Sequence, residues 1–407
     1  MTFKKRIITA IATGAVLVNA MAPIALADTL TVSGNGAFSN NAVNVTNVSN
    51  TVVNQTNNAN ITNHVDSNAT TGGNSSNFNT GGNSTISTGN ASSNVNVSTA
   101  VNLNKANVSC GCENRGASVN VTGNGAYSDN GVNVTNVNSV FLNQNNDANI
   151  KNDIKAQSST GKNDSSYNTG GSTVILTGIA STNVSVDNKA NANFATIGGS
   201  NGSAGGSSVT ISGNGAFSEN EVGLAKVSAV VLNQNNDAFI SNDIDAHAKT
   251  GDNTSQFNTG GNNGISTGDA KTNVSVDNLA NFNWADLNCD CTLDGLTVKV
   301  AGNGAESENG VTADSVSSVF PNQANDASLW NDVFGKAKTG DNTLGFSTGS
   351  VLGDPVILTG NGSSTTDVNN AGNVNVLDNG NSVSLPGNWN LGVNFDLSGF
   401  LSFLSMV

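Results

Sequence analysis

The chain has 407 residues and a formal net charge of −14, and only 5% of its residues are aromatic and 11% charged. Its two arginines are Arg6 and Arg115, so it lacks the basic stripe that neutralises phosphates, and nucleic-acid binding is not expected. Asn, Gly, Ser and Thr take the place of charged and aromatic residues, so the pattern of the sequence has to decide whether the chain is ordered.

Residues 1–27 predict a secretory signal peptide. Three cations at positions 4–6 precede an apolar run that ends at about Leu26, and the small-x-small triplet 25–27 lies before Asp28. Cleavage there removes three cations and no acids, which takes the formal charge from −14 to −17. The alternative is an N-terminal membrane anchor. We therefore expect a secreted, extracellular protein that is soluble or bound to the cell surface.

The rest of the chain contains four copies of one unit. The sequence Gly-Asn-Gly-Ala begins at positions 34, 123, 213 and 302, in steps of 89, 90 and 89 residues. An Asn-Gln pair and a Thr-Gly pair keep the same steps, which indicates that a structure fixes the spacing. The predicted domains are repeat 1 (28–117), repeat 2 (118–207), repeat 3 (208–294), repeat 4 (295–382) and an apolar C-terminal tail (383–407). Repeat 4 is divergent, with Pro321 at an aliphatic position, and is expected to cap the array.

Strict alternation of residue types predicts β-strands in each unit. One face of repeat 2 carries Val140, Leu142, Gln144, Asn146, Ala148, Ile150, Asn152, Ile154 and Ala156, a period of two that no helix produces. This run is longer than an ordinary strand, so we expect it to fold over near 145–147. A second inward face is predicted at Val184, Val186, Asn188, Ala190, Ala192 and Phe194. Gly- and Asn-rich clusters between the runs predict tight turns.

The predicted inward face combines small aliphatic side chains with amides, and this favours stacking. A β-sandwich would leave those amides unsatisfied, whereas stacked coils let each amide bond to its counterpart in the next coil. The predicted fold class is therefore all-β, a repeat β-solenoid or β-arch stack of four units of about 90 residues; the alternative is a set of tandem β-sandwich domains. The predicted inward amide ladder consists of Gln55, Asn57, Gln144, Asn146, Gln234, Asn236, Gln323 and Asn325.

The pattern around the Asn-Gln pair resembles the curlin-type repeats of bacterial surface amyloids. It is carried by Val140-x-Leu142-x-Gln144, then by Asn146 and Ala148 and by Ile150-x-Asn152. The resemblance implies an extracellular fibre subunit in a biofilm matrix or on a cell surface.

Four cysteines form two Cys-x-Cys pairs at equivalent points of repeats 1 and 3. In a secreted chain oxidised pairs are expected, either closed locally or crosslinking neighbouring molecules. A metal site is a third option, although no His lies near in sequence. The disulfide candidates are Cys110, Cys112, Cys289 and Cys291.

Several acids recur at fixed positions of the units. Stacked carboxylates on an outer face could hold Ca²⁺ through their oxygens, whereas the simpler interpretation is a row of solvated surface acids. The calcium candidates are Asp147, Asp153, Asp237 and Asp243. No other cofactor is expected.

The sequence offers no constellation for catalysis. His64 and His247 lie at different places in their units, and the recurring acids are unlike a single active site. We therefore expect a structural protein rather than an enzyme: a fibre or adhesin-type scaffold that associates with itself and contacts glycans or the cell envelope. The alternative is a secreted β-helical carbohydrate-active enzyme that uses paired carboxylates.

Overall fold

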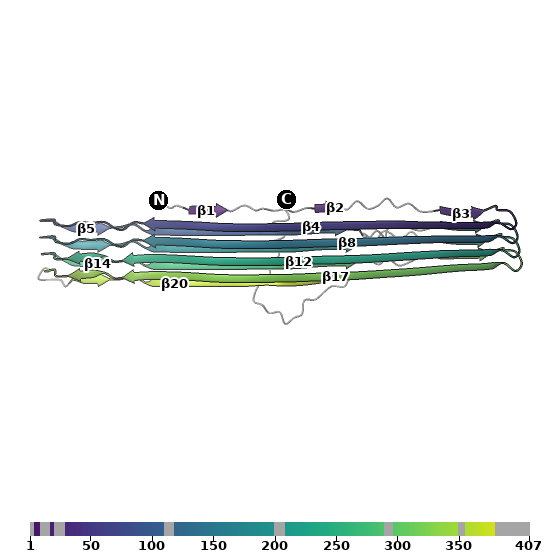
Figure 1. The fold of residues 1–407 in the computed structure, drawn as a ribbon. Coiled ribbons are helices and arrows are strands. Elements are labelled where there is room, and N and C mark those ends of the chain that lie inside the picture. The colour runs from purple at the N-terminus through teal and green to yellow at the C-terminus, as the bar shows by residue number, and fades with distance from the viewer. Residues whose placement is uncertain are drawn as a thin grey trace, which may run out of the picture.

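The computed structural model describes residues 4–8, 17–19, 29–109, 118–198, 208–288, 296–348 and 355–378. All regular structure in these residues is β-strand, without helix. Each unit forms one coil, and the four coils lie one on the next (Figure 1). The predicted all-β repeat stack is therefore confirmed.

Each coil contributes four main strands, which we give by type. The first short strands are β3 (Thr29–Ser33), β7 (Ser118–Thr122), β11 (Ser208–Ser212) and β16 (Thr297–Ala301). The long strands are β4 (Asn40–Thr70), β8 (Asp129–Ser159), β12 (Glu219–Gly251) and β17 (Glu308–Gly340). The second short strands are β5 (Ser84–Ser87), β9 (Thr173–Leu176), β14 (Asn263–Ser266) and β19 (Val356–Leu358). The return strands are β6 (Ala91–Val108), β10 (Ala180–Gly198), β15 (Ala270–Asn288) and β20 (Gly362–Asp378).

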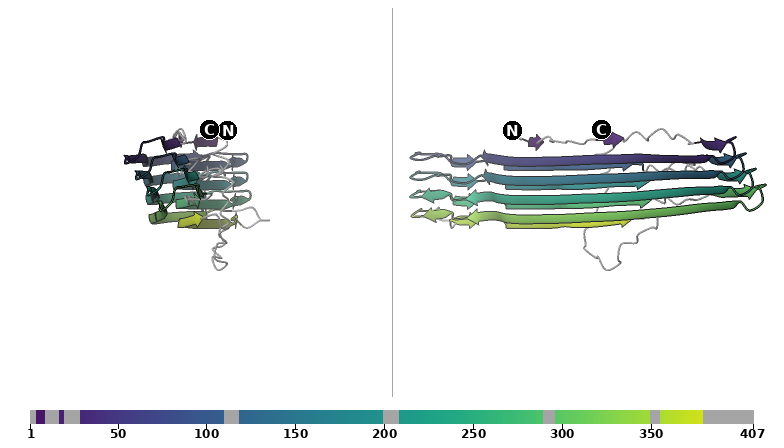
Figure 2. Two further views of the ribbon diagram at one scale, coloured as in Figure 1. Left: turned by 90° about the vertical axis from the view of Figure 1, so that its right-hand side faces the viewer. Right: turned by 45° about the vertical axis from the view of Figure 1, so that its right-hand side comes forward.

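Equivalent strands of successive coils pair in parallel and in register. The long strands form one sheet in the order β17-β12-β8-β4, and the return strands form another that includes β6-β10-β15-β20. The long sheet makes one layer and the shorter sheets lie against it, as the turned views show (Figure 2). Two additional strands, β13 (Thr254–Gln256) and β18 (Thr343–Gly345), pair with each other in the turn region.

Two strands from the predicted signal peptide lie on the first coil. β1 (Lys4–Ile8) and β2 (Leu17–Asn19) both pair in parallel with β6, with Lys4 opposite Asn94 and Leu17 opposite Lys105. The coil-1 edge of the return sheet therefore accepts a parallel strand.

The predicted fold-over near residues 145–147 is wrong. β8 runs without interruption from Asp129 to Ser159, roughly 100 Å at about 3.3 Å per residue. Its neighbours β4 and β12 pair with it along this whole length, so each added residue adds ladder hydrogen bonds on both sides. The turn residues lie only at the ends of the long strands.

The predicted inward face of the return strand is correct only up to residue 190. Asn191 has a positive φ of 61°, and from there the inward positions are Asn193, Ala195 and Ile197. Phe194 and its partner Trp284 consequently lie on the outer side, and their rings are tilted at 6.4 Å. Asn is among the few residues that adopt the left-handed conformation at low cost, and an Asn occupies this position in every coil.

The core alternates apolar clusters with amide layers along the strands. Leu142 and Leu232 pack with Ala195 and Ile197 in one cluster, and Ile150 and Ile240 pack with Ala190 and Ala280 in the next. Buried amides of the long strands lie between these clusters. Aliphatic residues hold the two layers together, and the amides in between specify the register.

We predict that Asn191→Ala lowers the free energy of unfolding by about 3–5 kcal/mol. The Asn191 amide accepts from Nδ2 of Asn102 (2.9 Å) and donates to Oδ1 of Asn281 (3.0 Å) and to the carbonyl of Asp237. Alanine would leave these buried groups unpaired and would itself be strained at positive φ. Urea denaturation measures the effect.

The matched control is Asn183→Ala. Asn183 makes the same two bonds along the stack, to Asn94 and from Asn273, both at 2.8 Å, but its side chain is partly exposed on the outer face. Water replaces its bonds there, so we expect a loss below about 1 kcal/mol. Equal losses for the two variants would contradict the role assigned to burial.

Candidate assembly interface

The predicted inward Gln side chains form a continuous ladder. Nε2 of Gln144 donates to Oε1 of Gln55 (2.7 Å), Gln234 donates to Gln144 (2.8 Å), and Gln323 donates to Gln234 (2.7 Å). Gln144 and Gln234 are completely buried. Each Nε2 also reaches a return-strand carbonyl, as from Gln144 to Phe194 (3.0 Å), so the ladder joins both layers.

The predicted inward Asn side chains form a second ladder, from Asn57 through Asn146 and Asn236 to Asn325, at 2.9–3.0 Å. Return-strand amides complete it. Nδ2 of Asn104 donates to Oδ1 of Asn146 (2.9 Å), and Nδ2 of Asn146 donates to Oδ1 of Asn193 (2.8 Å). The result is a zigzag of amides that crosses between the layers from coil to coil.

Two more ladders run through Asn residues that the sequence analysis placed on the inward faces. Asn152 belongs to the ladder Asn63, Asn152, Asn242 and Asn331, and Asn188 belongs to the ladder Asn188, Asn278 and Asn370. Two further buried ladders escaped the sequence analysis, although their Asn residues repeat in phase in successive units. They run through Asn102, Asn191, Asn281 and Asn373 and through Asn104, Asn193, Asn283 and Asn375.

These inward Asn ladders share one direction. In each of them Nδ2 of one coil donates to Oδ1 of the following coil. The last coil therefore ends in donors: among the described residues, Nδ2 of Asn370 and Asn373 has no acceptor. The first coil ends in acceptors, because Oδ1 of Asn57 and Asn102 receives no described donor. The two ends of the stack are complementary.

Two glycines of the first coil lack the close contacts that the equivalent glycines of coils 2–4 make with the preceding coil. A Cβ on Gly125, Gly215 or Gly304 would lie 2.3–2.4 Å from a backbone nitrogen of the preceding coil, and their equivalent Gly36 has nothing within 4 Å. In the same way Gly178, Gly268 and Gly360 would meet the preceding coil at 2.4–2.5 Å, and their equivalent Gly89 meets nothing. Neither Gly36 nor Gly89 has a positive φ. Among the described residues no coil precedes the first one, so Gly36 and Gly89 face open space where their equivalents meet backbone.

Exposed aromatic rings stack at both turns of the coils. Phe38, Tyr127 and Phe217 form one stack, and Phe78, Tyr167, Phe257 and Phe346 form the other, with ring centroids 5.0 Å apart. The terminal rings are the most exposed, at 74% for Phe78 and 79% for Phe346, against 42% for Phe257. Glu306 takes the aromatic position of the first stack in coil 4, so the second stack alone presents an open ring face at both ends.

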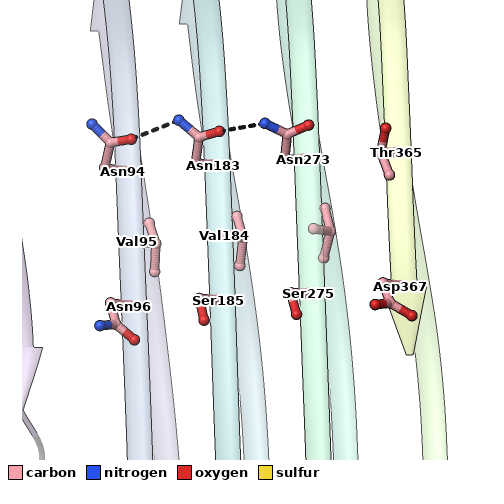
Figure 3. A pocket seen from close by; sticks show the side chains of 11 residues that line it. Asn94, Val95, Asn96, Asn183, Val184, Ser185, Asn273, Ser275, Thr365 and Asp367 are labelled. Atoms are coloured by element: carbon pink, nitrogen blue, oxygen red, sulfur yellow. Dashed lines mark hydrogen bonds between the residues drawn. The ribbon is translucent and has the colours of Figure 1, made fainter. Parts of the chain in front are cut away.

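A shallow groove of 380 Å³ crosses the outer side of the return strands (Figure 3). Asn94, Asn183 and Asn273 line it with amides that bond to one another along the stack (Figure 3). Val184 lies between this row and the next one, which includes Ser185. The groove is neutral over most of its length and has no acid–base pair facing a common point.

The calcium candidates lie in register on the outer side of the long sheet. Asp147 opposes Asp237, and Asp153 opposes Asp243. No group of three or more His, Cys, Asp or Glu side chains that could hold a metal is found in the described part of the chain. Asp153 instead bonds Nδ1 of His64 at 2.9 Å. The four disulfide candidates lie outside the described residues.

Asp277, on the return strands, is a carboxyl whose pKa is perturbed. Asp187 and Asp277 are opposite each other on β10 and β15. Partial burial raises the pKa of Asp277, and the negative charges of Asp187 and Asp367 raise this pKa further, whereas Lys189 opposes the shift. His247 lies elsewhere, on the long sheet beside Asp245 (2.6 Å). The described residues therefore do not combine the paired acids and histidines into one site.

Comparison with protein-family models, with curated protein sequences and with solved structures finds no match. No helix capable of spanning a bilayer occurs in the ranges that the structure describes.

We predict that Asp277→Asn raises stability at neutral pH. A carboxyl whose pKa is raised by folding opposes the folded state when it is ionised, and this effect disappears as the pH falls below the carboxyl range. The gain in melting temperature should therefore be present at pH 7 and shrink towards pH 3. Asp314→Asn is the control, because the residue opposite Asp314 on the neighbouring strand is the uncharged Ala225 rather than another acid. A gain for Asp277→Asn that stayed constant with pH would contradict the electrostatic explanation.

Proposed function

We propose that this protein is a secreted structural protein, a fibre subunit of a cell surface or biofilm matrix, and that its copies stack end to end. In this proposal coil 4 of one copy lies on coil 1 of the next, in parallel and in register, which replaces the expectation that repeat 4, with Pro321, caps the array. The role is that of a scaffold without catalysis. Leader removal after residue 27 would precede assembly outside the cell.

The observation that carries the proposal is the pair of glycines in coil 1. Gly36 and Gly89 face open space, while glycine at the same positions in coils 2–4 is required by the close approach of the preceding coil. In a stack of copies, coil 4 of another copy would lie against these two glycines. The close approach of backbone would then require glycine in coil 1 as it does in coils 2–4.

The amide ladders support the same contact. The last coil offers Nδ2 of Asn373 and the first coil offers Oδ1 of Asn102, and these two Asn residues occupy one position of the repeat. Buried amides gain most from such bonds when their neighbours exclude water. Donors at one end and acceptors at the other favour addition in a single orientation.

The sheet edges also favour end-to-end addition. Among the described strands, β4 and β17 have neighbours on one side only, and long unpaired parallel edges are templates for further strands. β1 and β2 pair in parallel along β6, which is where β20 of a preceding copy would lie. Cleavage of the leader would free this edge.

The recurrence of acids in successive coils supports a scaffold over an enzyme. Asp147, Asp237 and Asp326 share one position, and Asp153, Asp243 and Asp332 share another. A repeated outer surface fits a role in which every coil does the same work, with contacts to glycans or to the envelope made along its length.

We predict that Gly36→Ala combined with Gly89→Ala abolishes filaments of the mature chain and leaves the single molecule folded. Each added methyl points into open space in one copy and would meet backbone about 2.5 Å away in a stack, by analogy with Gly125 and Gly178. Electron microscopy and sedimentation measure assembly, and the melting temperature measures folding.

Gly131→Ala provides the control for this experiment. Gly131 also has open space, but it lies on the outer side of β8, and its coil-1 equivalent is Ala42. It should assemble as the wild type does. Filaments of the Gly36→Ala/Gly89→Ala variant, or the absence of filaments from the mature wild type, would refute end-to-end stacking.

We also predict that Asn373→Asp weakens assembly without destabilising the single molecule. The aspartate keeps the oxygen that accepts from Asn281 (3.1 Å) and tolerates the positive φ of 58°. It loses the amide hydrogens that would bond the next copy and would bury a charge in the contact. The critical concentration for filaments should rise at least tenfold. Gln157→Glu, an equal charge change on the outer side of β8 near its C-terminal end, should have little effect.

A further inference from the structure

The outer side of the long sheet carries an apolar band. It comprises the outward residues 44–56 of β4 and their partners on β8, β12 and β17. Two apolar rows run through it along the stack. The first row is Val48, Val137, Val227 and Val316, and the second is Val52, Phe141, Val231 and Phe320.

Most of these side chains are open to solvent. The exposed fractions are 61% for Val48, 64% for Val52, 40% for Phe141, 54% for Val316 and 59% for Phe320. Large apolar side chains gathered in one uncovered area mark an interaction surface. The pattern here is continuous from the first coil to the last, so it is a property of the whole sheet.

The band is almost free of charge, in contrast to the rest of a chain that carries −14. Asp314 is its one charged residue, and the remaining outward positions hold Asn, Ser, Thr, Gly or Ala. Acids begin where the band ends, with Asp147, Asp237 and Asp326 on the next outward row. An apolar centre with a charged rim is the usual anatomy of a protein interface.

We propose that this apolar band binds the same band of a second copy, so that two long sheets pack face to face. The two copies are related by a twofold axis parallel to the stacking direction. This symmetry brings identical uncharged surfaces together, places the acidic rows of the two copies at opposite edges of the contact, and leaves the ends of both stacks pointing the same way. The pairing is separate from end-to-end stacking and goes beyond it.

The alternation of large and small side chains between the rows of the band fits this arrangement. Between the two apolar rows lies a row of smaller residues, Asn50, Ser139, Ala229 and Ser318. A twofold axis between this row and the second apolar row seats each copy's Val52–Phe320 row in the other's row of small residues. Side chains of facing sheets interdigitate in this manner at a separation of about 10 Å.

The size of the band is sufficient for a stable dimer. With the axis between the Asn50 row and the Val52 row, the two bands overlap over residues 46–56 of β4 and their partners. Eleven residues along the strands and four strands across give roughly 680 Å² per copy at about 3.3 Å per residue and 4.7 Å per strand. Standard interfaces bury about 600–1,000 Å² per partner, so a single pair of molecules reaches this range before any end-to-end contact is made.

The test uses Phe141→Lys combined with Val231→Lys in the Gly36→Ala/Gly89→Ala background, where end-to-end growth is blocked. The background protein should sediment as a dimer, and the two lysines should raise its dissociation constant about 100-fold. Lysine lowers the net negative charge, so general repulsion between copies would change in the opposite direction. Analytical ultracentrifugation gives the mass, and the melting temperature checks the fold.

Thr62→Lys combined with Ser241→Lys is the matched control. These residues lie on the same outer side beyond the band, in the row where Lys151 occurs naturally, and the dimer should persist. A monomeric background protein, or a dimer unaffected by lysines in the band, would overturn the proposal. Because the readout is a discrete dimer, this result stays separate from the outcome for end-to-end filaments.

Discussion

The structure depends on the buried Asn amide that bonds to its own counterpart one coil away. An amide carries both a donor and an acceptor, so a row of identical Asn residues satisfies itself only when the strands are parallel and in register. A slip of one residue would turn every inward amide outward and expose the aliphatic residues between them. Because an unpaired buried amide is costly, these ladders exclude alternative pairings, and the aliphatic clusters supply the adhesion between layers. The nearly flat long sheet is consistent with this, since side-chain ladders are among the features that stabilise untwisted sheets.

Much of this fold could be predicted from the sequence. Motifs repeated at a constant spacing predicted four units. Residue types that alternate with a period of two predicted strands with Gln144 and Asn146 on the inner side. The length of β8 was not predicted. Strands in ordinary sheets are short because the twist and the edges of those sheets limit their length, whereas β8 has neighbours on both sides that are as long as itself. The left-handed Asn191 was missed because Ala192 and Asn193 are both small enough to face inward. One feature of the sequence did indicate that the inward positions change after Asn191 and its equivalents: Phe282 and Trp284 are too large to fit inside a layer of Asn and Ala. The open ends could not be predicted, because the Gly-Asn-Gly-Ala sequence around Gly36 is the same as in the other units and only its spatial neighbours differ.

The coils differ mainly where they meet solvent. The inner positions of the long strands repeat Gln, Asn and Ala almost unchanged, while the outer positions range from Thr62 through Lys151 to Trp330 at one site. This division follows from the physics of the two faces, because each inner side chain must match the coil before and after it and each outer one meets water. A protein of this kind can therefore vary single outer positions without changing its fold, while other outer rows, such as Asp147, Asp237 and Asp326, stay the same from coil to coil.

The shared direction of the inward Asn ladders gives the molecule an electrical polarity. Each amide is a small dipole, and dipoles aligned head to tail add along an axis, as peptide dipoles do in a helix. Here the positive, N–H side faces the last coil and the negative, C=O side faces the first. The inward Gln ladder and several outer Asn ladders, such as the one from Asn273 through Asn183 to Asn94, run the other way and offset part of the sum. The stack consequently has a field of its own along its axis, which would attract anions to one tip and cations to the other.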